Sequence, residues 1–132
     1  MKALLWNSSL ETGINKIDEQ HKELITKISE LMEMAKNPVT NGLKIKDIIA
    51  FLESYVKTHF STEEAFMKVK KYQSMVSHVR EHQYFTSEFL KLKDKLNKEG
   101  ITLELKLKLN NLLVDWLIKH ISNVDKKLSE IA

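Results

Sequence analysis

The sequence lacks cysteine altogether, and it contains only three glycines and one proline in 132 residues. The absence of cysteine excludes disulfide frameworks, iron–sulfur clusters and thiolate zinc sites. So little glycine and proline argues against a turn-rich β-sandwich or barrel. Hydrophobic residues still make up 42% of the chain, which is enough to bury a core. A chain of this length is expected to form one domain over residues 1–132.

Long apolar runs are missing as well. The N-terminal apolar run, residues 3–6, is too short for a secretory signal. No later stretch approaches the roughly 18 apolar residues of a membrane span. The net charge is only +3, and the lysines are interleaved with acidic residues. We therefore expect a cytoplasmic protein that binds neither a membrane nor a nucleic acid.

Four segments carry apolar residues at helical spacing. They cover approximately residues 18–36, 43–69, 74–97 and 102–120. Asp18 and Thr102 are expected to be N-caps, Pro38 ends the first segment, and Gly100 closes the third in a left-handed conformation. Short connections between amphipathic helices predict an all-α protein, an up-down-up-down four-helix bundle.

All five histidines fall on the apolar stripes of these segments. A single histidine in such a place is usually a buried imidazole that is hydrogen-bonded to a neighbour. Five of them would cost about 1–3 kcal/mol for each polar group left unsatisfied. A bound metal ion removes that cost, because each ring donates a lone pair to the ion. The metal-binding interpretation is therefore favoured over a purely structural bundle.

The spacing of the polar residues supports a shared cavity. His59 and Glu63 are four residues apart, as are His78 and His82, so each pair lies on one face of its helix. Each pair can therefore point into the same interior space.

The last pair is spaced differently. His120 and Asp125 are five residues apart, which is about 140° on a regular helix. We predict that the fourth helix ends or deforms between Ile121 and Val124, which turns Asp125 toward the core. With His21 the set contains five nitrogens and two carboxylates. That exceeds what one tetrahedral zinc uses and suits two six-coordinate ions that share bridging carboxylates.

These residues form the ordered pattern H…HxxxE…HxxxH…HxxxxD. The segments that carry it are Trp6, TGINKIDEQHKEL around His21, HFSTEEAFM from His59, HVREH from His78 to His82, and WLIKHISNVD from Trp116 to Asp125. In this pattern the sequence resembles the hemerythrin family, and within it the single-domain bacteriohemerythrins, over residues 6–126. The chain has Gln73 after Tyr72, where many relatives have proline.

The resemblance implies two iron ions per chain, joined by an oxo or hydroxo bridge. By position, the implied ligands are His78, His82 and His120 for one iron, His21 and His59 for the second, and Glu63 and Asp125 as bridges between them. The residues implied to wall the O2 pocket are Phe60, Trp116, Leu117, Ile121 and Ile25, although ordinary core residues would occupy the same places.

The function that the resemblance implies is reversible O2 binding for storage, delivery or scavenging, without enzymatic turnover. A reductase or an O2-consuming enzyme is a candidate partner. Two alternatives are a di-iron redox enzyme (an oxidase, a peroxidase or a nitric-oxide-handling protein) and an oxygen or iron sensor that acts through a separate partner. None of the histidines has glutamate three residues before it, so the ExxH signature of ferritin-like di-iron proteins is absent.

Overall fold

The computed structural model describes residues 6–132, apart from the side chain of Thr40. Most of the short N-terminal apolar run lies outside the described residues. The helices are α1 (Asn15–Ala35), α2 (Pro38–Val69), α3 (Met75–Glu99) and α4 (Leu103–Leu109), with a short 3₁₀ turn, η1 (Ser8–Leu10), before them. α4 continues through the π-helical segments η2 (Asn110–Leu117) and η3 (His120–Val124) and ends in the 3₁₀ segment η4 (Asp125–Ile131).

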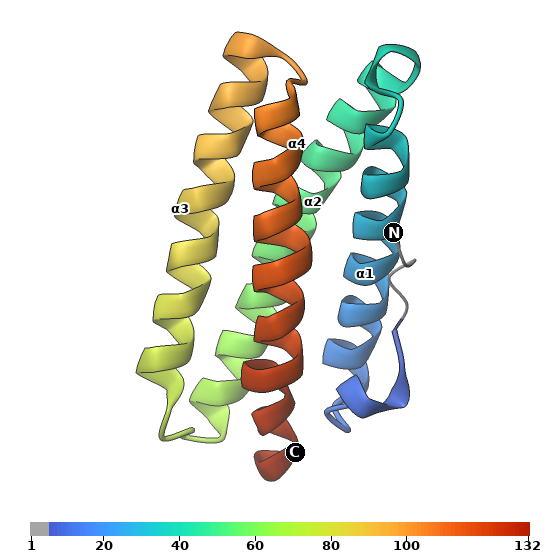
Figure 1. Ribbon diagram of the computed structural model, residues 1–132. Helices are drawn as coiled ribbons and strands as arrows, with labels where there is room; N and C mark the ends of the chain where they lie inside the picture. The colour runs from blue at the N-terminus through green and yellow to red at the C-terminus, as the bar shows by residue number, and fades with distance from the viewer. Residues whose placement is uncertain (1–5) are drawn as a thin grey trace.

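The four long helical segments run side by side along a common axis (Figure 1). The turns from α1 to α2 and from α3 to α4 lie at one end of the bundle, and the turn from α2 to α3 lies at the other (Figure 1). The predicted up-down-up-down four-helix bundle is therefore confirmed. Within the described residues, no helix is both long enough and apolar enough to cross a membrane.

α1 begins three residues earlier than the sequence predicts, because Asp18 is not its N-cap. The Asp18 carboxylate instead accepts hydrogen bonds from the Thr12 N–H at 2.8 Å and the Thr12 hydroxyl at 2.7 Å. It also accepts one from the Gly13 N–H at 3.2 Å, where the backbone has a positive φ of 83°. Asp18 thus fixes the turn that precedes the helix, rather than the helix end itself.

α2 also begins earlier than predicted, at Pro38 instead of residue 43. Proline suits the first position of a helix, since its φ is already helical and its missing N–H would have no partner there. The expectations for the fourth helix are confirmed, because the Thr102 hydroxyl accepts a hydrogen bond from the Leu105 N–H at 3.1 Å. Gly100 has the expected positive φ, 77°.

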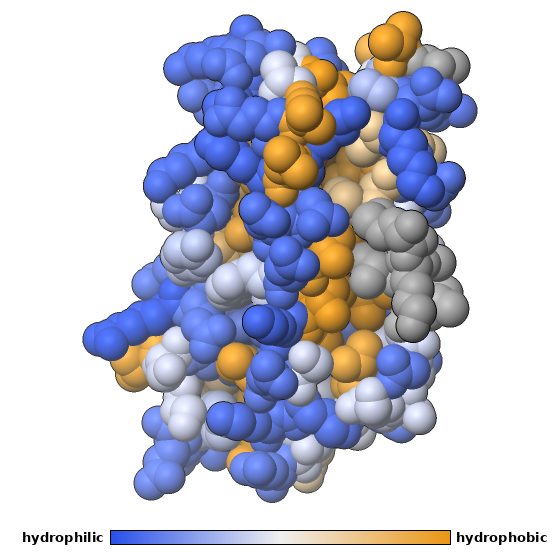
Figure 2. Space-filling view, viewed as in Figure 1, coloured by the Kyte–Doolittle hydropathy of each residue, from blue (hydrophilic) through white to orange (hydrophobic). Residues whose placement is uncertain are grey.

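The core consists of the apolar stripes of all four helical segments, and polar side chains cover most of the face shown in Figure 2. In the first half of α2 the apolar residues expected at helical spacing, Ile45, Ile48 and Leu52, are buried. Tyr55 and Phe66, which the same spacing predicts to be buried, are only half-buried, and the neighbouring Val56 and Met67 are buried instead. A smaller cluster of Ile17, Met67 and Leu128 closes the end of the bundle where α1 begins and α2 ends.

Candidate metal centre

The seven polar residues singled out by the sequence lie together in the interior of the bundle. They are His21 on α1, His59 and Glu63 on α2, His78 and His82 on α3, His120 in η3, and Asp125 at the start of η4. Each has at most 2% of its surface exposed. Because successive helices alternate in direction, the starts of α1 and α3 meet the ends of α2 and η3 at the same end of the bundle.

The potential ligand atoms form two overlapping groups, and within each group all lie within 4.8 Å of one another. The three-histidine group contains His78, His82 and His120 together with Glu63 and Asp125. The two-histidine group contains His21 and His59 with the same two carboxylates. Glu63 and Asp125 therefore belong to both groups, which is the arrangement expected of bridging ligands.

The two oxygens of Asp125 face different groups. Oδ1 lies 2.8 Å from His78 Nε2 and 2.9 Å from His120 Nε2, both in the three-histidine group. Oδ2 lies 2.9 Å from His21 Nε2, in the two-histidine group. A carboxylate in this position can contact an ion on either side without moving.

The carboxylate of Glu63 also reaches both groups, but its oxygens are not divided between them. Its Oε1 lies 3.1 Å from His82 Nε2 and 3.5 Å from His59 Nε2, and its Oε2 lies 3.6 Å from His21 Nε2. The residue is fully buried, yet neither oxygen accepts a hydrogen bond within the described chain.

The predicted deformation of the fourth helix is confirmed by η3. The Asp125 N–H bonds to the carbonyl of His120, five residues earlier, and to that of Ile121. This wider turn places residue 125 nearly above residue 120, whereas a regular α-helix would rotate it away. The π-helical turn is therefore the local structure that brings both His120 and Asp125 into the interior.

Carboxylates hold the outer nitrogens of two histidines in the three-histidine group. His82 Nδ1 donates to Glu64 Oε2 at 2.8 Å, and His120 Nδ1 donates to Glu81 Oε1 at 3.0 Å. An ionised carboxylate can only accept, so Nδ1 carries the proton in each ring. The inward Nε2 is then the nitrogen available to a metal.

An amide plays the corresponding part in the two-histidine group. His59 Nδ1 lies 2.8 Å from Gln20 Oε1, while Gln20 Nε2 donates to the Thr62 hydroxyl at 3.1 Å. That hydroxyl donates in turn to the Thr58 carbonyl at 3.0 Å, so it must accept from Gln20. The chain of bonds fixes the orientation of the amide and leaves its oxygen to accept from His59.

Gln20, Glu64 and Glu81 are three further residues of the site that the sequence pattern does not predict. Each is next to a cluster residue in the chain, but its hydrogen bond reaches a histidine on another helix. Sequence adjacency to a ligand was the available signal. Choosing the partner required the register between helices, which the sequence alone does not supply.

In the absence of a metal ion, four of the histidines divide into two classes, those with a lowered pKa and those with a raised pKa. Burial lowers the pKa of His59 to about 4 and that of His82 to about 2. Burial acts the same way on His21, but the hydrogen bond with Asp125 and the nearby charges of Asp125 and Glu63 outweigh it and raise the pKa to about 9. His120 likewise has a pKa raised to about 9, because its contacts with Asp125 and Glu81 outweigh burial.

The pKa values of the two carboxylates, Glu63 and Asp125, also shift in opposite directions. Burial, followed by the charge of Asp125, raises the pKa of Glu63 to about 8. Burial also opposes ionisation of Asp125, but hydrogen bonds with the surrounding histidines outweigh it and hold that pKa well below its usual value. Such divergence among neighbouring groups is typical of functional sites.

The donor set fits a pair of divalent or trivalent cations. Buried polar atoms without hydrogen-bond partners include Nε2 of His59, His82 and His120 and both oxygens of Glu63. Leaving such atoms unpaired costs free energy, and a metal ion satisfies them directly. Imidazole nitrogens with carboxylate oxygens suit iron and other first-row transition metals.

Aromatic rings cover part of the cluster. Phe60 stacks on His82 with 3.8 Å between ring centroids, and Trp116 stacks on His120 at 5.0 Å. Ile25, Leu117 and Ile121 are buried in the same core.

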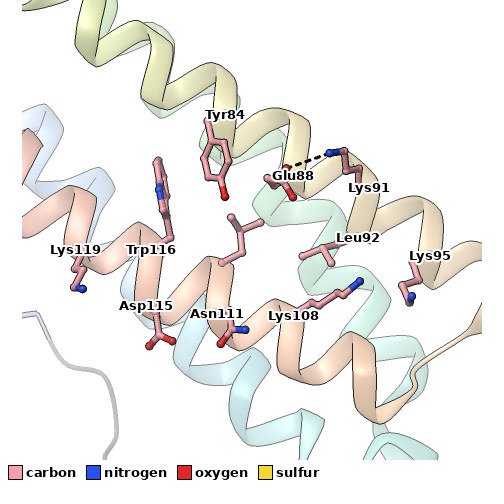
Figure 3. Close-up of a pocket in the computed structure, with 11 residues that line it drawn as sticks. Tyr84, Glu88, Lys91, Leu92, Lys95, Lys108, Asn111, Asp115, Trp116 and Lys119 are labelled. Carbon is pink, nitrogen blue, oxygen red and sulfur yellow. Dashed lines mark hydrogen bonds and ion pairs between the residues drawn. The ribbon is translucent and has the colours of Figure 1, made fainter.

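Trp116 is half-buried and also faces outward. It lines a surface groove of about 500 Å³ between α3 and the fourth helix, where its ring centroid lies 5.6 Å from that of Tyr84 (Figure 3). The groove has both lysine and acidic side chains along its walls (Figure 3).

The fold and this cluster define a class of protein: a four-helix bundle with a buried cluster of histidines and carboxylates that could hold metal ions. A family model described as the hemerythrin HHE cation binding domain matches residues 12–132. The chain belongs to the hemerythrin family.

Named relatives cover most of the chain. A bacteriohemerythrin from Clostridium acetobutylicum is 30% identical over 93% of this chain and 96% of its own length. A bacteriohemerythrin from Pseudomonas aeruginosa is 32% identical over 95% of this chain and 78% of its own. A myohemerythrin from Theromyzon tessulatum is 27% identical over 92% and 88%, respectively.

Proposed function

We propose that the protein binds O2 reversibly at two iron ions and serves in oxygen storage, delivery or scavenging. The observation that carries the proposal is the pair of overlapping ligand groups that share Glu63 and Asp125. Membership of the hemerythrin family, with relatives named bacteriohemerythrin and myohemerythrin, supports iron as the metal and O2 as the ligand.

The proposed ligands follow the two groups. His78, His82 and His120 would hold one iron, His21 and His59 would hold the second, and Glu63 and Asp125 would bridge them together with an oxo or hydroxo group. A pair of irons, when bound, would supply the two electrons that O2 takes up on binding and returns on leaving. The two-histidine group has one protein nitrogen fewer, so the place for O2 is proposed on that side.

The surroundings favour a carrier over an enzyme. Ile25, Phe60, Leu117 and Ile121 are at most 5% exposed, and with Trp116 they are proposed to wall the O2 pocket. An apolar wall excludes water and second reductants, which would otherwise divert O2 into irreversible reduction. All five histidines are placed in the cluster, so none is left elsewhere as an acid–base catalyst.

Two further parts of the proposal concern the cell. The proposed location is the cytoplasm, and the candidate protein partner is a separate reductase or O2-consuming enzyme. A reductase would return oxidised iron to the ferrous state.

The fate of O2 tests this function directly. The iron-loaded, reduced protein is exposed to a known amount of O2 and then purged, while the O2 taken up and released is measured. Near-complete recovery of O2 over repeated cycles is expected. Consumption of O2 with release of peroxide or water would contradict the carrier function and favour the di-iron redox enzyme.

A further inference from the structure

The hydrogen bonds behind the metal centre are distributed unevenly between the two groups. In the three-histidine group, carboxylates of Glu64 and Glu81 accept from the outer nitrogens of His82 and His120. In the two-histidine group, the neutral amide of Gln20 accepts from His59. The two groups therefore share their bridging carboxylates but differ in the charge that stands behind their imidazoles.

This difference has a direct effect on metal binding. A carboxylate that accepts from Nδ1–H draws that proton toward itself and makes the opposite Nε2 a stronger electron-pair donor. An amide carries no net charge, so its oxygen strengthens Nε2 as a donor less than a carboxylate does. The side chains of Glu64 and Glu81 are 35% and 37% exposed, so solvent screens their long-range charge and the hydrogen bond itself is the main route of influence.

The same bonds decide which rings are prepared for a metal. The outer partners hold His82 and His120 in the orientation that presents Nε2 inward. The outer Nδ1 atoms of His21 and His78, in contrast, have no hydrogen-bond partner in the described chain. Two of the three rings in the three-histidine group are thus held from behind, against one of two in the other group.

We propose that Glu64 and Glu81 are positioning residues that make the three-histidine group the tighter metal site, which is loaded first. The proposal rests on the two-metal centre of the proposed function. It assigns to Gln20 the opposite role, because its neutral amide leaves the two-histidine group with the weaker affinity. The two-histidine group is also the proposed side for O2, because it has one protein nitrogen fewer than the three-histidine group.

Anaerobic titration of the metal-free protein with Fe(II), in competition with a coloured Fe(II) chelator, tests the proposal. We expect two binding steps of one metal each and of unequal affinity in the wild-type protein. His59→Ala should remove the weaker step and so assign it to the two-histidine group.

The outer residues are then changed one at a time. Glu64→Gln and Glu81→Gln keep an acceptor but remove the charge, and each should weaken the tighter step about 10- to 100-fold. Gln20→Glu should raise the Fe(II) affinity of the weaker step and so narrow the difference in affinity between the two steps. Glu88→Gln is the matched control, because Glu88 lies on α3 like Glu81 but its carboxylate pairs with Lys91 at 3.2 Å.

The specificity for one step separates positioning from a general structural role. Equal weakening of both steps in Glu64→Gln and Glu81→Gln would show general damage to the bundle and would overturn the proposal. Unchanged affinities, a single two-metal step in the wild type, or loss of the tighter step in His59→Ala would overturn it as well. Rescue of the tighter step by Glu81→Asp, which restores the charge, would support it.

The outcome is separable from that of the proposed function. A wild-type protein that binds two Fe(II) in the expected order but does not bind O2 reversibly would refute oxygen carriage alone. A protein that binds O2 reversibly while Glu64→Gln and Glu81→Gln leave both steps unchanged would refute only the role of the outer carboxylates.

Discussion

At the scale of single residues, the metal centre is built from side chains that would be costly to bury without an ion. Glu63 is fully buried, and neither of its oxygens accepts a hydrogen bond in the described chain. The histidines differ from one another mainly in what lies behind them, a carboxylate at His82 and an amide at His59. Iron binding is thus proposed to depend on residues beyond the seven proposed ligands.

Leu117→Asn tests the proposed water-excluding wall. Leu117 is fully buried and lies one turn before His120. A polar amide there should admit water to the centre, and the O2-bound protein should autoxidise several-fold faster, as followed by decay of its visible spectrum.

A matched variant removes the effect of stability. Leu105→Asn buries the same amide in α4, at a residue that is also fully buried but lies far along the helix from the histidines. Both variants should lose about 1–3 kcal/mol of stability from the unpaired amide. If only Leu105→Asn and the wild type autoxidise slowly, the wall is supported; equal rates in all three proteins would refute it.

At the scale of elements, the C-terminal segment determines the position of Asp125. The π-helical turn η3 brings Asp125 above His120, and the 3₁₀ segment η4 follows immediately. Leu128 in η4 is fully buried against Ile17 of α1 and Met67 of α2. This apolar contact fixes the end of the chain, and with it the Asp125 carboxylate three residues earlier.

Leu128→Ala should therefore lower both stability and metal retention. Loss of a buried leucine side chain costs about 2–5 kcal/mol, which urea unfolding of the metal-free protein measures. Iron should also be lost faster to a chelator, because η4 no longer holds Asp125. Leu107→Ala, at a leucine that is 58% exposed, is the control and should change neither property. Normal iron retention in Leu128→Ala would show that Asp125 is held independently of this contact.

Periodicity was sufficient to predict the four helices, but not where α1 and α2 begin. The N-cap Thr102 followed from local chemistry, and the five-residue spacing of His120 and Asp125 required a deformed turn. Asp18 was misassigned because a carboxylate can bind the preceding turn as well as a helix end. The start at Pro38 was missed because proline both ends one helix and opens the next.

The interior cluster could be predicted because its residues lie on the apolar stripes, whereas their outer partners could not. Glu64 on α2 bonds to His82 on α3, and Glu81 on α3 bonds to His120 in η3, so each hydrogen bond joins two neighbouring helices. Such contacts depend on the relative rotation and height of the helices. Those follow from packing of the whole core, and no local pattern encodes them.

At the scale of the whole molecule, all four helical segments supply residues to one centre, so metal binding and folding are coupled. Without a metal ion, several residues of the cluster bind protons more tightly than they would in water. His21 and His120 have pKa values raised from 6.5 to about 9, and that of Glu63 is raised to about 8.

The metal-free protein should therefore lose stability as the pH rises from 6.5 toward about 9. A group with a raised pKa binds its proton more tightly in the folded state, so its contribution is complete at low pH and is lost on passing through the folded value. Urea unfolding across this range measures the change.

Below pH 6.5 the stability of the metal-free protein should change with pH in the opposite direction. The pKa values of His59 and His82 are lowered to about 4 and about 2, so stability should also fall as the pH drops below 6.5. In the metal-loaded protein the fall above pH 6.5 should disappear, because the ion has displaced the protons. Stability of the metal-free protein that rises steadily from pH 6.5 to about 9 would contradict this account.

The measurement that tests the central claim most directly combines metal analysis with visible absorption spectra taken with and without O2. We predict two irons per chain and an absorption band that appears on addition of O2 to the reduced protein and vanishes when O2 is removed. A protein that holds one zinc or no metal, or whose band fails to reverse, would contradict the account.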